Sequence, residues 1–108
     1  MDLTLDLQET GLAMFFKPYQ IASLNILWSS DQNLSSRQVW ERVNEVLSDS
    51  ISRASIINFL NASVDNGLLN YEETTGKGGY RRIYSPKLSR PELSVYMSKK
   101  VTERLNTL

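Results

Sequence analysis

One signal for the start of a helix recurs along this chain. Ser35 is followed three residues later by Gln38, and Ser89 by Glu92. This is the spacing of a capping box, in which a side chain satisfies a backbone N–H at each of the two positions. Together with starts at Pro18 and Ser52, these signals predict helices over residues 18–28, 36–47, 53–66 and 90–108.

Apolar residues repeat at helical spacing after each of these starts, and the pattern changes at Gly67. Residues 68–71 are typical of an extended segment, residues 74–79 form the glycine-rich turn Thr-Thr-Gly-Lys-Gly-Gly, and residues 80–84 are rich in aromatic and β-branched side chains. The sequence therefore predicts a mainly α fold with a small β-hairpin, in the α+β class.

The 108 residues include neither Cys nor His, and they carry 12 basic and 12 acidic side chains. Without these two residue types, the commonest nucleophiles, general bases and metal ligands are missing. The glycine-rich turn leads into a strand, whereas a phosphate-binding P-loop leads into a helix. We expect no enzymatic activity, cofactor or metal site. The acidic start of the chain and the lack of a long apolar run predict a cytoplasmic protein that does not bind membranes.

The neutral charge balance is unevenly distributed. Residues 53–90 contain six basic and three acidic side chains, 6 − 3 = +3, so the remainder of the chain carries −3. A local basic excess can attract phosphate even on a neutral protein, because such fields extend over about a Debye length, roughly 8–10 Å. This part of the chain is therefore the candidate for binding double-stranded DNA.

Three helices followed by a hairpin with a basic tip is the order of a winged helix-turn-helix domain. The segments IASLNILW (residues 21–28), SIINFL (55–60), NGLL (66–69) and YSP (84–86) resemble the penicillinase-repressor family of prokaryotic regulators. The resemblance implies a winged helix-turn-helix with a C-terminal dimerisation helix, acting as a sequence-specific DNA-binding transcriptional repressor. Ala62 stands where the family usually has an Arg, and a chain without Cys cannot sense copper through thiols.

The predicted domain organisation has three parts. An N-terminal arm covers residues 1–17, the winged-helix domain 18–88, and the C-terminal helix 89–108. In a helix-turn-helix the second helix of the motif enters the major groove, and the hairpin wing contacts the DNA backbone or the minor groove. The candidate DNA-binding residues are Ser52, Arg53, Ser55, Ile57, Asn58, Asn61, Lys77, Arg81 and Arg82.

The last predicted helix has an apolar stripe that extends beyond a small three-helix core. The stripe could fold back on its own domain, but we expect it to pair with a second copy of the chain, so that a homodimer reads two half-sites. The candidate dimerisation residues are Leu93, Tyr96, Met97, Val101, Leu105 and Leu108. The alternative at this stage is a winged-helix module that binds another protein and no DNA. The sequence identifies no effector, whether small molecule or protein.

Overall fold

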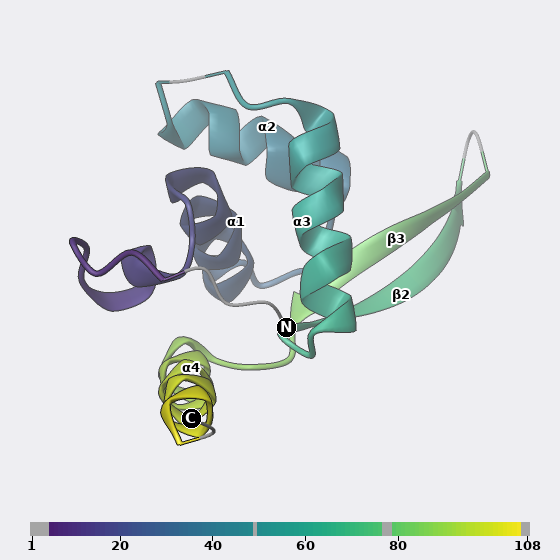
Figure 1. Ribbon diagram of the computed structural model, residues 1–108. Coiled ribbons are helices and arrows are strands. Elements are labelled where there is room, and N and C mark those ends of the chain that lie inside the picture. The colour runs from purple at the N-terminus through teal and green to yellow at the C-terminus, as the bar shows by residue number, and fades with distance from the viewer. Residues whose placement is uncertain (1–4, 49, 77–78, 107–108) are drawn as a thin grey trace.

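The computed structural model of the chain describes residues 5–48, 50–76 and 79–106 (Figure 1). In chain order its elements are the 3-10 helix η1 (Gly11–Met14), α1 (Pro18–Ser29), β1 (Leu34–Ser35), α2 (Ser36–Val46), α3 (Arg53–Asp65), β2 (Leu69–Gly76), β3 (Gly79–Pro86) and α4 (Arg90–Leu105). The predicted α+β class is confirmed, as is the order of three helices, a hairpin and a last helix. Among the described residues, no helix is both long and apolar enough to cross a membrane.

Both predicted capping boxes are present. The Ser35 backbone N–H donates to Gln38 Oε1 at 2.9 Å, and the Gln38 backbone N–H donates to Ser35 Oγ at 3.2 Å. Ser89 and Glu92 exchange the same two bonds at the start of α4. The backbone N–H and the hydroxyl of Ser89 stabilise the Glu92 carboxylate and lower its pKa. These local bonds fix where α2 and α4 begin, independently of the tertiary fold.

A tryptophan in α2 holds the loop that leads into α3. Trp40 Nε1–H donates to the Ile51 carbonyl oxygen at 2.8 Å, and the Ile51 backbone N–H donates to Asn44 Oδ1, also at 2.8 Å. The loop is therefore bonded to α2 just before Ser52 caps α3. Because both backbone groups of Ile51 are tied to α2, the position at which α3 starts is fixed relative to α2.

The sheet has three antiparallel strands in the order β1-β3-β2. In the hairpin, Tyr71 lies opposite Tyr84 and Gly76 opposite Gly79, while the two-residue strand β1 pairs Leu34 with Tyr84. The sequence did not predict β1, because two residues are too few to show an alternating pattern. Figure 1 shows the hairpin extending away from the three helices, so only its base adjoins the core.

The core lies between α1, α2, α3 and the base of the hairpin. Its buried apolar side chains are Leu12, Phe16, Ala22, Leu24, Leu27, Leu34, Val39, Val43, Ile56, Phe59, Leu60, Leu68, Leu69, Tyr84, Leu93 and Met97. Trp28 and Trp40 are half-buried against this core. Trp28 Nε1–H also donates to the Leu88 carbonyl oxygen at 2.9 Å, which attaches α1 to the segment before α4.

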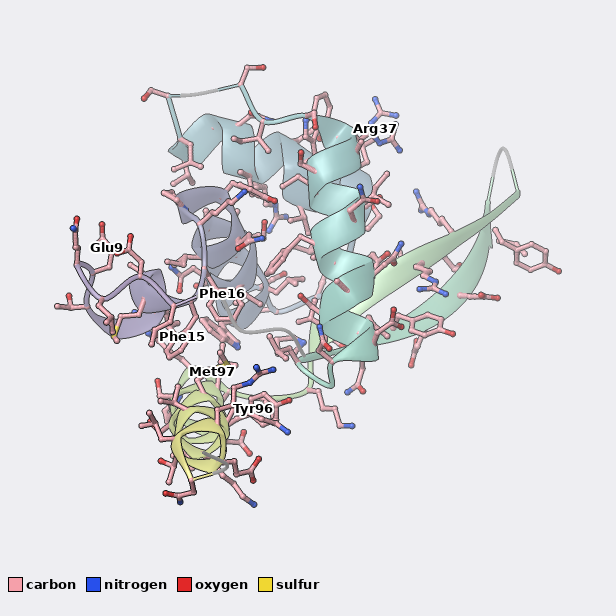
Figure 2. The ribbon with its side chains drawn as sticks, in the orientation of Figure 1. Glu9, Phe15, Phe16, Arg37, Tyr96 and Met97 are labelled. Carbon is pink, nitrogen blue, oxygen red and sulfur yellow. The ribbon has the colours of Figure 1, made fainter. Side chains whose placement is uncertain are left out.

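The segment predicted as an N-terminal arm belongs to the core over part of its length, which corrects that prediction. Leu12 and Phe16 are buried, and the Phe16 ring meets Phe59 of α3 edge to face at 6.2 Å between centroids. Figure 2 shows Phe15 and Phe16 on the side of this segment that faces α4. The described residues 5–10 of this segment form turns.

This correction predicts how the segment contributes to stability. Replacing Phe16 by Ala should lower the free energy of unfolding by about 3 kcal/mol, because it empties a buried aromatic site beside Phe59. Urea denaturation measures the change. Leu7→Ala is the matched control in the same segment, since Leu7 is 78% exposed while Phe16 is 7% exposed. An equal change in the free energy of unfolding for the two variants would contradict this account and favour a free arm.

Candidate nucleic-acid interface

Helix α3 buries one face and leaves the other open. Ile56, Phe59, Leu60 and Ser63 are buried on its inner side. Its exposed positions are Arg53, Ala54, Asn58, Ala62 and Asp65. The spacing of four between Ala54, Asn58 and Ala62 places them along one line of the helix surface. The outer face is therefore made of small and polar side chains, with one cation at the N-terminal end and one anion at the C-terminal end.

The predicted base-reading residues differ in how available they are. Arg53 and Asn58 are exposed in the N-terminal half of α3, and Ile57 beside them is half-buried. The Ser52 and Ser55 hydroxyl oxygens lie 2.8 Å apart, and Ser52 Oγ also accepts the Ser55 backbone N–H at 3.1 Å. Both hydroxyl groups thus take part in the cap of α3. Arg53 and Asn58 are the polar side chains of this half that point away from the fold.

Asn61 lies one turn further along α3 and faces the hairpin. Its Oδ1 accepts a hydrogen bond from the Tyr84 hydroxyl at 2.6 Å and another from Arg82 Nη1 at 3.1 Å. Burial raises the pKa of Tyr84, and the charge and hydrogen bond of Arg82 act in the opposite direction. Asn61 therefore differs from the prediction of a base-reading side chain, because its oxygen is bonded within the protein.

The two wing arginines occupy opposite faces of the hairpin, since alternate residues of a strand point to opposite sides. Arg82 is half-buried on the face that turns towards α3, and its guanidinium carbon lies 4.1 Å from the centre of the Tyr71 ring. Arg81 is exposed on the other face, opposite Thr74. The third predicted wing cation, Lys77, lies outside the described residues.

Two exposed side chains near these elements were missed by sequence reasoning. Arg37 lies in the first turn of α2, where it forms a 3.1 Å ion pair with Glu41 that is exposed to solvent. Figure 2 shows Arg37 at the end of the molecule remote from α4. Tyr80 is exposed beside the tip of the wing, opposite Thr75. The signals available in the sequence were a cation two residues after a helix cap and an aromatic residue just after a glycine-rich turn.

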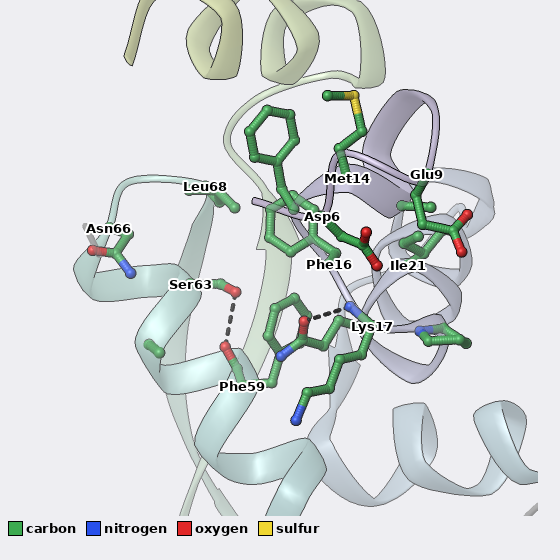
Figure 3. Close-up of a pocket in the computed structure, with 15 residues that line it drawn as sticks. Asp6, Glu9, Met14, Phe16, Lys17, Ile21, Phe59, Ser63, Asn66 and Leu68 are labelled. Atoms are coloured by element: carbon green, nitrogen blue, oxygen red, sulfur yellow. Dashed lines mark hydrogen bonds between the residues drawn. The ribbon is translucent and has the colours of Figure 1, made fainter. Parts of the chain in front are cut away.

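A groove of about 900 Å³ lies beside the C-terminal half of α3 (Figure 3). Its apolar lining includes Phe16, Phe59 and Leu68, and Asp6 and Glu9 add two carboxylates. The lining does not include Arg53 or Asn58, so the groove is separate from the exposed N-terminal half of α3. Within residues 5–48, 50–76 and 79–106, no cluster of three or more His, Cys, Asp or Glu side chains is arranged to hold a metal ion.

The stripe predicted for dimerisation is divided by the structure. Leu93 and Met97 are each 1% exposed and pack into the core of their own chain, which corrects their assignment to a subunit interface. The half-buried Tyr96 also packs against this core, and Figure 2 shows it beside Met97. Val101 is half-buried and Leu105 is 66% exposed. Leu108 lies outside the described residues.

Two solved structures resemble this fold. The ferric uptake regulator (Fur) of Vibrio cholerae aligns over 68% of this chain and 54% of its own, with 14% identity and a TM-score of 0.52. PadR of Bacillus subtilis, solved in complex with operator DNA, aligns over 74% of this chain and 45% of its own, with 20% identity and a TM-score of 0.56. The chain therefore spans about half the length of either protein. No protein-family model and no curated protein matches the sequence.

These comparisons show that the chain has a winged-helix fold, as the sequence predicted. They show this fold alone, and the narrower resemblance to penicillinase repressors is not shown. In this fold α2 and α3 form the helix-turn-helix, and β2 and β3 form the wing.

The different surroundings of Asn58 and Asn61 predict different effects on stability. Asn61→Ala removes the acceptor of the buried Tyr84 hydroxyl and should lower the free energy of unfolding by about 1–3 kcal/mol. Asn58→Ala is the control on the same helix and should change that free energy by less than about 0.5 kcal/mol, because Asn58 is exposed. Urea denaturation of both variants measures the difference. An Asn61→Ala variant with the same free energy of unfolding as the wild type would contradict the hydrogen bonding of Asn61.

Proposed function

We propose that this protein is a sequence-specific DNA-binding transcriptional regulator of a prokaryotic cytoplasm. The observation that carries the proposal is the exposed N-terminal half of α3, which presents Arg53 and Asn58 in a winged-helix fold. PadR, which shares this fold, was solved in complex with operator DNA. The second helix of a helix-turn-helix binds the major groove with its N-terminal residues at base edges, and Arg53 and Asn58 occupy that part of α3.

Arg53 and Asn58 suit base recognition. An Arg side chain pairs with guanine through two hydrogen bonds and an Asn side chain pairs with adenine, each adding about 1–3 kcal/mol of discrimination. Ala54, which is also exposed in this half, leaves room for the groove edges and can contact a thymine methyl group. The half-buried Ile57 lies beside them as a further apolar contact.

The cations that would bind phosphate lie in the wing and in α2 and not on the exposed face of α3. Arg81 is exposed near the end of the wing, and Arg37 is exposed in the first turn of α2, the helix that crosses the DNA backbone in this motif. The partial positive charge of a helix N-terminus adds to the attraction at Arg37. Contacts of this kind position the protein on any duplex, whereas Arg53 and Asn58 select the sequence.

The finer proposal is a homodimeric repressor. Helix α4 uses Leu93 and Met97 to pack against its own domain, which leaves Val101 and Leu105 in its second half for a partner. Two copies related by a two-fold axis present two α3 helices to successive half-sites of an operator. A dimer bound in this way represses transcription by occupying the DNA that the polymerase needs.

Salt dependence separates phosphate contacts from base contacts. Binding of the wild-type protein to a duplex should weaken steeply as salt rises, because phosphate contacts release counterions. Arg81→Ala should weaken binding by a similar factor on random duplexes and on a duplex that the protein selects from a random pool. It should also make the slope of log affinity against log salt concentration shallower by about one. Asn58→Ala should cost about 1–3 kcal/mol on the selected sequence and little on random DNA. Fluorescence anisotropy at several salt concentrations measures all three.

Lys99→Ala is the matched control for Arg81→Ala, since it removes one exposed cation from α4. It should leave the salt slope unchanged. A wild-type protein that shows no salt-dependent affinity for duplex DNA would rule out the proposal and favour a winged-helix module that binds another protein.

The dimer proposal predicts an effect of charge at the end of α4. Val101→Asp combined with Leu105→Asp should convert a dimer into monomers with unchanged helical content, because two carboxylates would be buried at the interface. Analytical ultracentrifugation and circular dichroism give the two readings. Lys99→Asp is the control on a different side of α4, since it also shifts the net charge by two units. A wild-type monomer at high micromolar concentration would contradict the proposal.

A further inference from the structure

Four side chains form a polar bridge between the wing and α3, which we call the wing bridge. Asn61 Oδ1 of α3 is its centre, and it accepts from Tyr84 Oη and Arg82 Nη1 of β3 at 2.6 and 3.1 Å. The Arg82 guanidinium in turn lies over the ring of Tyr71 on β2, 4.1 Å from its centre. The wing bridge therefore joins α3 to both strands of the hairpin.

The bridge uses the whole capacity of one acceptor. An amide oxygen has two lone pairs, and Asn61 Oδ1 receives two donors. Recognition of adenine by Asn needs that same oxygen to accept from the base. Asn61 cannot fill both roles at once, so its oxygen serves the contact between α3 and the wing.

The position of the bridge lets it control the orientation of the wing relative to α3. Arg82 and Tyr84 point to the same side of β3, and Gly79 lies three residues beyond Arg82, about 10 Å further along the strand. Figure 1 shows the hairpin extending away from the helices. A change of angle at the bridge therefore moves the exposed side chains of Arg81 and Tyr80, which lie one and two residues from Arg82 towards the end of the hairpin.

We propose that Asn61 is a positioning residue that holds the wing at a fixed angle to α3, so that the two elements meet DNA as one rigid surface. The inference rests on the proposed function for its role in DNA binding. In this role Asn61 orients the wing so that its cations reach the phosphate groups of the DNA. Arg82 then has a structural contact within the protein in addition to its charge.

The test uses an uncharged substitution with an electrostatic readout. Asn61→Leu keeps the net charge and the approximate size of the side chain but removes the acceptor. If the wing loses its position, its cations leave the phosphates, so the salt slope on a random-sequence duplex should become shallower by about one. Affinity for that duplex should fall by about tenfold at low salt. Asn106→Leu, at an exposed position just after α4 and outside both α3 and the wing, should leave this slope unchanged.

A second measurement needs no DNA. Residual dipolar couplings report the orientation of the hairpin relative to α3 in the full chain. In the wild type and in Asn61→Asp, which keeps an acceptor oxygen, the couplings of both elements should fit one rigid body. In Asn61→Leu and in the milder Tyr84→Phe they should not. Tyr84→Phe keeps the buried ring, so it provides a folded variant even where Asn61→Leu unfolds.

The outcomes separate this inference from the proposed function. If Asn61→Leu loses affinity only for a selected sequence, with the salt slope and couplings of the wild type, Asn61 is a base-reading residue and the inference is overturned. If the wild type binds no DNA, the proposed function fails and the couplings decide alone. An unchanged hairpin orientation in Asn61→Leu and Tyr84→Phe overturns the inference, and a changed one supports it.

Discussion

The rest of the structure depends on the burial of the inner face of α3. Ile56 and Leu60 are fully enclosed by the core, and Phe59 adds edge-to-face contacts with Phe16 and Tyr19. Burial of one such side chain contributes about 1.5–3 kcal/mol, so the three together outweigh any single polar contact of the helix. Packing therefore sets the rotation of α3, and that rotation decides which side chains face outward.

Polar contacts refine the placement that the core provides. The bonds from Trp40 and Asn44 to Ile51 fix where α3 begins, and the contacts of Asn61 with Tyr84 and Arg82 join its other half to the hairpin. Both sets are far apart on the helix, so they restrain α3 at two places. Arg53 and Asn58 lie between these restraints, on the side of the helix that the core leaves open. The proposed DNA-binding surface would bind with little ordering cost, because α3 is already held at these two places.

The elements of this fold can be predicted from sequence because their signals are local. A capping box lies within four residues, and the periodicity of α3 is complete within its own length, so the starts of α2, α3 and α4 were predicted to the residue. The two-residue strand β1 has no such pattern. Its pairing of Leu34 with Tyr84 joins segments far apart in the chain.

The same distinction applies to the candidate site. Exposure of Arg53 and Asn58 follows from the helical period, which the sequence displays. The roles of Asn61 and Arg82 depend on a contact across 21 residues, which no local pattern reveals. Leu93 and Met97 were predicted to pair with a second copy of the chain, and Phe16 was placed in an N-terminal arm, because these residues lie outside the three predicted helices of the core. The core extends to include all three. An apolar residue in a terminal segment looks the same in sequence whether it meets its own domain or a partner.

The central claim is that the exposed N-terminal half of α3 and the wing form one DNA-binding surface. Backbone amide chemical shifts recorded during titration of the full chain with duplex DNA test it most directly. The account predicts that the largest shifts occur in residues 53–58 of α3 and 79–82 of the wing, with smaller ones in the first turn of α2. Shifts confined to α4 and to the groove lined by Phe16 and Phe59, with α3 and the wing unaffected, would contradict it.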